Sequence, residues 1–367
     1  MSALHQLALT YLKNIGPTLA KSLIAQFGSA EKVFEATPAK LLKIQGIGDK
    51  TVKQLNFKEA LLQAEKELKF VEKNNIQILF YADSAYPKRL KNCHDSPILL
   101  YYKGNADLNT QRIISIVGTR NATEYGKNLC RQLIEELQKL NILVVSGLAL
   151  GIDGAVHKEC LKYHTKTVGV LGHGLDKLYP SQNRLIAEKM VDCGGLLSEY
   201  PSGTMPDREN FPQRNRIVAG IADAIVVVEA SVKGGALITA EIANSYNRDV
   251  FAFPGRIGDE FSEGCNFLIR NNKAALLSCV ADLGYVLGWE NNIEVKRTQK
   301  QLILPLGLTV EEELIFETIR LNNSPLPIDD LTIKTKLTTS QLAMNLLNME
   351  MQGIIKALPG KIYTIGG

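Results

Sequence analysis

The sequence of 367 residues contains no long apolar run and no short cysteine or histidine spacing that would bind a metal. Its six cysteines are scattered without a Cys-x-x-Cys pair, so we predict no zinc site and expect reduced, mostly buried thiols. Residues 1–12 lack the basic start and the apolar run of a secretory signal. These absences exclude a membrane span and favour a cytoplasmic protein without a metal ion.

Two common nucleotide-binding motifs are also missing. Gly172-His-Gly174 begins a Gly-x-Gly pattern, but Lys177 stands where the third glycine of a dinucleotide site belongs. The Gly-Lys pairs at 126–127 and 360–361 are followed by Asn and Ile, so neither completes a phosphate loop of the Walker type. We therefore expect no nicotinamide cofactor, no ATPase activity and no other cofactor.

Composition and charge set broad limits on the class of protein. With 45% hydrophobic and 22% charged residues, the chain can bury a sizeable core and form more than one domain. The formal net charge of +4 is too small to establish nucleic-acid binding, because many proteins of other functions carry as much. Evidence for nucleic-acid binding must therefore come from the positions of the basic residues.

Residues 1–72 have a helical pattern with two similar hairpins. In each hairpin, over residues 12–27 and 42–55, an apolar segment, a glycine-containing turn and a second amphipathic segment follow one another. This pattern resembles a tandem helix-hairpin-helix, in which free N–H groups of the turn bind a DNA phosphate. A small protein-interaction module remains an equal alternative. The residues suited to a secondary DNA contact are Gly46, Gly48, Lys50 and Thr51.

Residues 73–288 have the pattern of a doubly wound α/β domain. Short β-branched runs alternate with helical stretches, which is typical of parallel strands that are buried on both faces. In such a sheet, a ligand binds beyond the carboxyl ends of the strands, where the glycine and polar residues of this region fall. The predicted strands are residues 113–117, 142–145, 167–171, 224–229 and 250–253.

Two basic segments indicate a polyanionic ligand. We interpret residues 210–216, which contain Arg214 and Arg216, as a loop in which Pro212 lets the backbone approach an anion. The second segment, residues 233–239, begins with Lys233 and two glycines and is predicted to open a helix. Together they predict a site for a chain of phosphates.

Several ordered motifs make the chain similar to a known family. They lie at residues 115–120, 146–153, 168–176, 211–217 and 234–239, and they resemble the DNA-processing protein A family, DprA or Smf, over about residues 80–285. Lys233-Gly-Gly-Ala236 replaces the Lys-Ser-Gly-Ser that is common in the family, so two hydroxyl donors are lost.

The resemblance implies a non-catalytic protein that binds single-stranded DNA during natural transformation and loads the RecA recombinase onto it. It also implies a homodimer. Sequence-tolerant binding of a single strand needs a basic groove and a few aromatic side chains, which Phe211 beside Arg214 supplies. A fragment of about residues 75–290 is then expected to dimerise and to bind single strands. The residues assigned to DNA are Gly118, Thr119, Arg120, Ser146, Gly147, Arg208, Asn210, Phe211, Arg214, Asn215, Arg216, Lys233, Gly234 and Gly235.

The alternative function is a nucleotide-binding enzyme of the phosphoribohydrolase-like Rossmann superfamily. Its Pro-Gly-Gly-x-Gly-Thr-x-x-Glu loop does not align here, because Thr239 and Glu241 are misplaced relative to the glycines. Asp153 and His157 have the spacing of a catalytic pair, but an acid and a histidine near a helix start are more often a cap and its packing partner. The sequence therefore favours a binding protein.

The last region follows a polar linker at residues 289–304. Residues 305–367 are predicted to form helices that begin near Thr309, Ile328 and Thr338, followed by a hairpin at 354–365, and this order resembles a winged helix. The third helix contains no lysine or arginine, which disfavours sequence-specific reading of duplex DNA. Protein docking is the preferred interpretation, and weak DNA contact remains the alternative.

Overall fold

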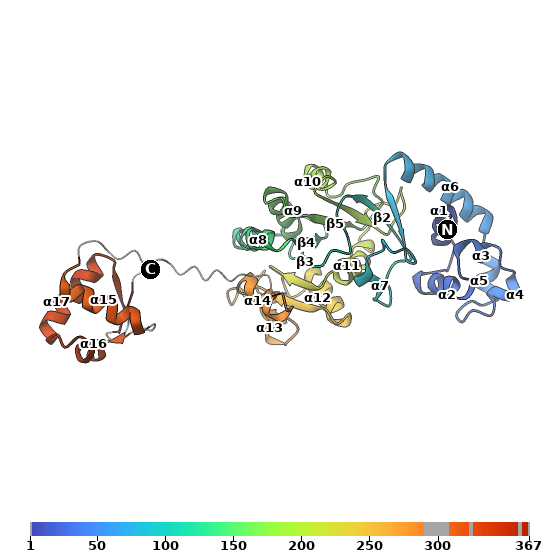
Figure 1. Cartoon of the computed structure of the whole chain (residues 1–367). Helices are drawn as coiled ribbons and strands as arrows, with labels where there is room; N and C mark the ends of the chain where they lie inside the picture. Colours follow the sequence, from blue (N-terminus) through green and yellow to red (C-terminus); the bar gives the residue numbers. More distant parts are fainter. Residues whose placement is uncertain (1, 290–307, 323–325, 359–361, 366–367) are drawn as a thin grey trace. The chain divides into compact units, whose positions relative to one another are not determined.

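The computed structural model describes residues 2–289, 308–322, 326–358 and 362–365 (Figure 1). Its internal contacts divide the chain into two compact units, residues 1–294 and 295–367. Except for Trp289, the linker predicted at 289–304 lies outside the described residues.

A mostly parallel sheet forms the centre of the first unit. Among the described residues this sheet has nine strands in the order β1-β2-β6-β5-β4-β3-β7-β8-β9. The β1–β2 and β2–β6 pairs are antiparallel, and the other pairs are parallel. The strands are β1 (Gln77–Phe80), β2 (Leu99–Gly104), β3 (Ile113–Val117), β4 (Leu143–Ser146), β5 (Thr167–Leu171), β6 (Gly194–Ser198), β7 (Ala224–Val227), β8 (Asp249–Ala252) and β9 (Ala275–Leu276).

Helices cover both faces of this sheet, as the doubly wound pattern predicts. Ile113 and Val117 pack with residues of α11 and α12, whereas Ile114 and Ile116 pack with residues of α8 and α9. Burying one such side chain contributes about 1.5–3 kcal/mol, so both layers hold the strand ends in place. The helices are α7 (Lys88–Lys91), α8 (Glu124–Leu137), α9 (Ile152–Lys162), α10 (Arg184–Met190), α11 (Asn210–Ile221), α12 (Gly235–Ser245), α13 (Glu263–Arg270) and α14 (Val280–Val286).

The structure corrects the interpretation of residues 210–216 as a loop. They form the first turns of α11, which runs from Asn210 to Ile221. Pro212 is compatible with this helix because an N–H in the first turn has no intrahelical acceptor to lose. Farther along, Ile217 and Ile221 are buried against the sheet and fix the helix there. The prediction that residues 233–239 open a helix is confirmed, since α12 begins at Gly235.

The N-terminal helices contain the two predicted hairpins. The turn before α5 includes Gly46, whose φ of 90° lies in the left-handed region that favours glycine. The apolar cluster of this domain joins Leu7 and Leu23 to Phe80 of β1 and Tyr101 of β2. The helical domain therefore shares its core with the first two strands. The helices are α1 (Ala3–Thr10), α2 (Pro17–Phe27), α3 (Ala30–Phe34), α4 (Pro38–Leu41), α5 (Asp49–Gln54) and α6 (Phe57–Lys73).

The second unit is a winged-helix domain. Its third helix begins with a capping box in which Thr338 accepts from the Gln341 N–H, as the sequence predicts. Phe316, Leu331 and Leu346 form part of its apolar core. The elements are α15 (Val310–Asn322), α16 (Ile328–Thr335) and α17 (Thr339–Met351), with a sheet in the order β10-β12-β11 made of β10 (Leu326–Pro327), β11 (Ile355–Leu358) and β12 (Ile362–Ile365).

Candidate nucleic-acid interface

A groove of about 860 Å³ lies beyond the carboxyl ends of β3, β4 and β7. The chain passes from β3 to β4 on one side of the sheet and later returns to β7 on the other side of β3. This reversal of strand order separates the loops that follow β3 and β7, and ligands of open α/β sheets bind in the resulting crevice. Of the residues assigned to DNA from the sequence, those lining the groove are Gly118, Thr119, Arg120, Gly147, Arg208, Phe211, Arg214, Asn215, Gly234 and Gly235.

One wall of the groove is the start of α12. Gly234 is the N-cap residue of α12, and as a glycine it has no side chain that could accept from the free N–H groups of the first turn. Gly234, Gly235 and Ala236 line the groove, and Lys233 is exposed directly before them. The positive end of the helix dipole lies on this wall, and Lys233 adds its charge one residue before the lining begins, which favours an anion there.

Aromatic and cationic side chains meet at the opposite wall. The ring centroids of Phe211 and Tyr179 lie 6.0 Å apart with an interplanar angle of 34°. The guanidinium carbon of Arg120 lies 5.5 Å from the Phe211 centroid, within the range of a cation–π contact. Arg120 is exposed, and 49% of Tyr179 is accessible to solvent. This arrangement offers a flat apolar surface beside a charge that solvent can reach.

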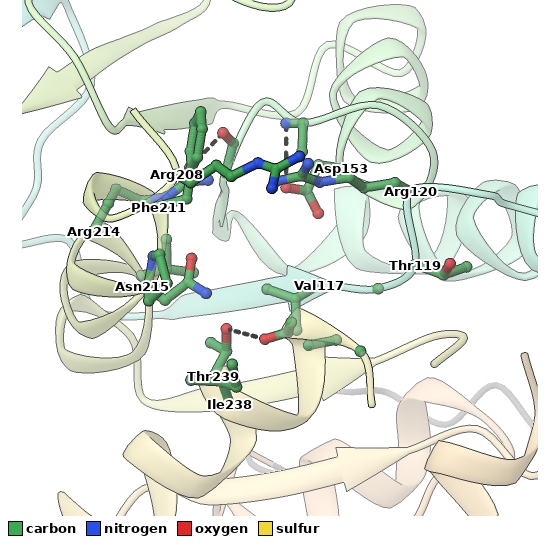
Figure 2. A pocket seen from close by; sticks show the side chains of 18 of the residues that line it. Val117, Thr119, Arg120, Asp153, Arg208, Phe211, Arg214, Asn215, Ile238 and Thr239 are labelled. Atoms are coloured by element: carbon green, nitrogen blue, oxygen red, sulfur yellow. Dashed lines mark hydrogen bonds between the residues drawn. The ribbon is translucent and has the colours of Figure 1, made fainter. Parts of the chain in front are cut away.

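The rim of the groove comes from the irregular segment between β6 and α11. Met205, Pro206 and Arg208 of this segment line the groove, and Met205 is 60% exposed. In Figure 2, Arg120 and Arg208 enter from opposite sides. Sequence reasoning missed Met205, Pro206 and the aromatic role of Tyr179. Tyr179 follows the family motif at residues 168–176 by three residues, but no residue pattern marks the segment at 205–206.

Arg214 lines the groove but is not a free donor, which corrects the sequence-based expectation. Its side chain is buried, and Nη1 donates to the main-chain oxygen of Gly147 (Figure 2) and to that of Val170. These oxygens lie at the carboxyl ends of β4 and β5. Burial lowers the pKa of Arg214 to about 10, and the nearby carboxylate of Asp153 opposes this shift, so the side chain remains charged at neutral pH. Arg214 therefore ties α11 to two strands.

Gly147 permits this contact at close range. A Cβ atom at position 147 would lie 2.4 Å from Nη1 of Arg214 and 2.6 Å from Oδ2 of Asp153. Any side chain there would have to displace the guanidinium, so packing accounts for the glycine, and its contact with a phosphate stays a prediction. Gly118 is similar, because a Cβ would lie 2.5 Å from Cγ1 of Ile152.

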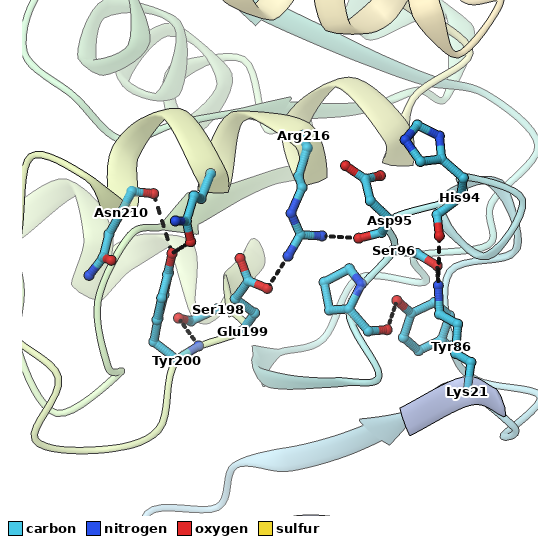
Figure 3. A network of polar contacts seen from close by, with 12 residues as sticks. Lys21, Tyr86, His94, Asp95, Ser96, Ser198, Glu199, Tyr200, Asn210 and Arg216 are labelled. Atoms are coloured by element: carbon cyan, nitrogen blue, oxygen red, sulfur yellow. Dashed lines mark hydrogen bonds and ion pairs between the residues drawn. The ribbon is translucent and has the colours of Figure 1, made fainter. Parts of the chain in front are cut away.

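Arg216 lies outside the residues that line the groove and also has internal partners. Nη1 donates to the main-chain oxygen of Asp95 at 2.6 Å, and Nη2 pairs with the Glu199 carboxylate (Figure 3). The side chains of Arg216 and Glu199 are 14% and 12% exposed. Burial raises the pKa of Glu199, and Arg216 opposes that rise. These contacts are those of a structural ion pair, which corrects the prediction of a phosphate donor.

Two further predicted residues lie beside the groove without lining it. Ser146 is fully buried, and its hydroxyl donates to the Ile116 oxygen at 2.6 Å. The Asn210 amide donates to the Met205 oxygen at 3.5 Å, a long contact between α11 and the rim. Both residues hold the walls together.

Asp153 and His157 have the contacts of structural residues. Oδ2 of Asp153 accepts from the Ala149 N–H at 3.3 Å. Thr167 Oγ1 donates to the Val144 oxygen, so Nδ1 of His157, 2.8 Å away, is the donor to that hydroxyl. Burial lowers the pKa of His157 to about 3, which keeps the ring neutral at neutral pH. Burial raises the pKa of Asp153, and Arg214 opposes the rise.

The proposed secondary site lies in the N-terminal helices. Gly46, Gly48 and Lys50 are exposed in and after the turn that precedes α5, and Thr51 is half-buried. Gly48 is the N-cap of α5. Their contact with DNA stays a prediction.

A metal site and a membrane-spanning helix are both absent from the described ranges. There, no group of three or more His, Cys, Asp or Glu side chains has a geometry that could hold a metal ion. The cysteines are free thiols, of which Cys279 is exposed. In the same ranges, no helix has the length and apolar character needed to span a bilayer.

Family models match three parts of the chain. The model of DNA recombination-mediator protein A matches residues 77–287, the SAM-like helix-hairpin-helix tandem matches 7–57, and the DprA winged helix domain matches 305–361. Protein Smf of Synechocystis sp. is 34% identical over 98% of this chain and 98% of its own length.

Two solved structures are similar to this chain. DNA processing protein A (DprA) from Streptococcus pneumoniae has a TM-score of 0.67 at 32% identity, covering 77% of this chain and 97% of that one. DNA processing protein A from Helicobacter pylori, described with a single-stranded DNA binding mode, has a TM-score of 0.53 at 29% identity and covers 59% of this chain and 96% of that one. The chain therefore belongs to the family of DNA recombination-mediator protein A, also called DprA or Smf.

Proposed function

We propose that the protein binds single-stranded DNA in the groove beyond β3, β4 and β7. One observation carries this proposal: a helix N-terminus faces an accessible pair of aromatic rings across a single groove, which the exposed cations Arg120 and Arg208 also line. Phosphates fit the first wall, and an unpaired base fits the second, because every base has a flat face that stacks on an aromatic ring. A duplex hides those faces.

The roles of the assigned residues follow from their exposure. Arg120, Arg208 and Lys233, together with the first N–H groups of α12, bind phosphates, and Phe211 and Tyr179 stack with a base. Arg214 and Arg216 hold α11, whose first turns present Phe211 and Asn215 to the groove. The relative from Helicobacter pylori with a described single-strand binding mode supports the ligand class.

The proposed role is non-catalytic. Among the described residues that line the groove, Asp153 is the only carboxylate, and these lining residues include no histidine, cysteine, lysine or serine. An acid–base reaction on a nucleotide would need a second titratable group within hydrogen-bond reach. This composition supports a binding protein over the nucleotide-processing alternative.

The bound strand is proposed to be handed to the RecA recombinase during natural transformation by a homodimer of this chain. Support for a self-association surface comes from exposed apolar side chains in the edge strand β9 and in the helix α14 that follows it in the chain. Leu276 is 49% exposed, Tyr285 77% and Val286 47%. An edge strand with apolar neighbours is a common place for association.

The test compares single- and double-stranded DNA of equal length and sequence at the same salt concentration. The proposal predicts clear preference for the single strand, and equal affinity would contradict it. A second assay follows recombinase filament formation on DNA already covered by single-strand-binding protein. Faster filament formation with this protein is the predicted result, and release of free base from a nucleoside monophosphate would favour the enzymatic alternative.

A further inference from the structure

The groove depends on a rim segment that is neither helix nor strand. Residues 201–209 carry Met205, Pro206 and Arg208 to the groove. Within the sheet domain, the Gly203 N–H donates to Oδ1 of Asp176 at 3.0 Å. Such a segment moves easily unless other contacts fix it, because it has no ladder of backbone hydrogen bonds.

The N-terminal helical domain supplies such a contact. Oε1 of Glu67 in α6 accepts from the Ser202 N–H at 2.9 Å, and Oε2 accepts from the Ser202 hydroxyl. Glu67 is only 4% exposed. The carboxylate thus reaches from a helix of one domain to the base of the groove rim in the next.

Glu67 occupies a buried position of α6 where packing alone would favour an apolar residue. The buried residues of this helix are Ala60, Ala64, Glu67 and Val71, which form one helical stripe. A carboxylate in an apolar stripe is unfavourable unless its oxygens are hydrogen-bonded. Ser202 provides both bonds, so the stability of this buried acid depends on the rim segment being in place.

A second polar contact links the same domain to α11. Nζ of Lys21 donates to the Ser96 hydroxyl at 2.7 Å, next to Asp95 (Figure 3). The main-chain oxygen of Asp95 in turn accepts from Arg216 of α11. The rim and α11 shape this side of the groove. The helical domain contacts the rim at Ser202 and contacts Ser96, next to the residue that holds α11.

We propose that Glu67 is a positioning residue for the DNA groove: the N-terminal domain sets single-strand affinity by holding the rim through Ser202, without touching the DNA. This inference rests on the proposed single-strand binding. The predicted change in DNA affinity when Glu67 is removed is opposite in sign to a direct electrostatic effect. Removing a negative charge from a protein that binds a polyanion strengthens binding by long-range attraction, whereas loss of positioning weakens it.

The experiment uses the full chain and a fluorescent single strand of thymidines. We expect Glu67→Ala to weaken binding at least about threefold, the range in which residues remote from a ligand alter its affinity. Glu67→Gln should bind like the wild type, because the amide oxygen accepts from the Ser202 N–H and the amide nitrogen donates to the hydroxyl oxygen. Glu65→Ala, at an exposed position of the same helix, is the matched control: it removes the same charge without the bonds to Ser202 and should leave affinity unchanged or slightly higher.

Two further readouts separate positioning from contact. The salt slope of Glu67→Ala should fall by no more than about 0.7, because Arg208 is the one proposed phosphate donor that the rim carries. Hydrogen exchange should become faster at residues 201–209 in the variant while β3 stays protected. Wild-type affinity, or tighter binding, in Glu67→Ala would overturn the proposal.

A failure of the proposed function can be told apart from a failure of this inference, because the wild type itself would then show no preference for single strands. If Glu67→Ala melts below the assay temperature, Ser202→Ala takes its place. This change removes the hydroxyl from the rim side and leaves α6 intact. Weaker binding by Ser202→Ala, with a salt slope reduced by no more than about 0.7, supports positioning, and wild-type affinity would overturn it.

Discussion

At the scale of single residues, exposure separates two kinds of arginine around the groove. Arg120 reaches solvent over the Phe211 ring, whereas Arg214 and Arg216 are bonded to main-chain oxygens or to Glu199. The sequence could show that arginines cluster here but not which ones are satisfied internally. The acceptors of Arg214 lie 67 and 44 residues away in the chain, so only the fold reveals them.

Arg120→Ala is expected to weaken single-strand binding to a similar degree for all base sequences, because its partner is a phosphate. One lost contact should reduce the magnitude of the salt slope by about 0.7. Titrations at several salt concentrations measure this slope. Arg131→Ala, which removes an exposed arginine from α8, is the matched control. An unchanged slope accompanied by a lower melting temperature would show that Arg120 is structural.

Phe211→Ala tests the stacking surface. Stacking on one base is worth about 1–3 kcal/mol, whereas truncation of a buried Phe lowers folding stability by about 3–5 kcal/mol. Since Phe211 is half-buried at the groove wall, we expect affinity to fall about tenfold with little change in melting temperature. Thermal unfolding and binding should be measured on the same preparation. A large loss of stability with normal affinity would place the base contact elsewhere.

At the scale of elements, the strands at the centre were predictable and the surrounding ones were not. The runs at 113–117 and 167–171 match β3 and β5 residue for residue, because strands buried on both faces need continuous β-branched residues. The antiparallel strands β1 and β2 and the glycine-led β6 are not predicted, since leucine, tyrosine and glycine outnumber β-branched residues in them. The start of α11 is not predictable either, because Pro212 is as typical of a loop as of a first helical turn.

Arg216→Ala tests whether α11 is held by its ion pair. Removing one partner leaves the Glu199 carboxylate buried without its charge partner, and such losses lower stability by about 3–5 kcal/mol. We expect a reduced unfolding midpoint in denaturant and an unchanged salt slope of DNA binding. The double variant Arg216→Ala/Glu199→Ala should be less destabilised than the sum of the two single changes. Full stability together with a flatter salt slope would restore Arg216 as a phosphate contact.

At the scale of the whole molecule, the N-terminal helices and the sheet domain behave as one structural unit. Their shared apolar cluster includes Phe80, Leu99 and Tyr101, which are at most 2% exposed. A fragment of residues 75–290, which the sequence predicts to dimerise and to bind single strands, lacks Glu67 and the helical side of this cluster. The periodicity of short segments shows which faces are apolar but not which partner covers them.

Removal of the C-terminal unit and removal of the N-terminal helices should therefore have different effects on stability and DNA affinity. A fragment of residues 2–289 is expected to keep wild-type single-strand affinity, because the groove and its supports lie within it. A fragment of residues 75–289 is expected to unfold at lower temperature and to bind more weakly, because it exposes the apolar cluster and loses Glu67. Circular dichroism melting and fluorescence anisotropy measure both properties. Equal behaviour of the two fragments would separate the helical domain from the groove.

The central claim is that a single strand lies in the groove beyond β3, β4 and β7. Photo-crosslinking of the full chain to a thymidine strand, followed by mass spectrometry of the linked peptides, tests it most directly. The account predicts crosslinks at Tyr179 or Phe211 and their loss in Phe211→Ala. Crosslinks confined to residues 46–51 or to the winged-helix unit, with none at the groove, would contradict it.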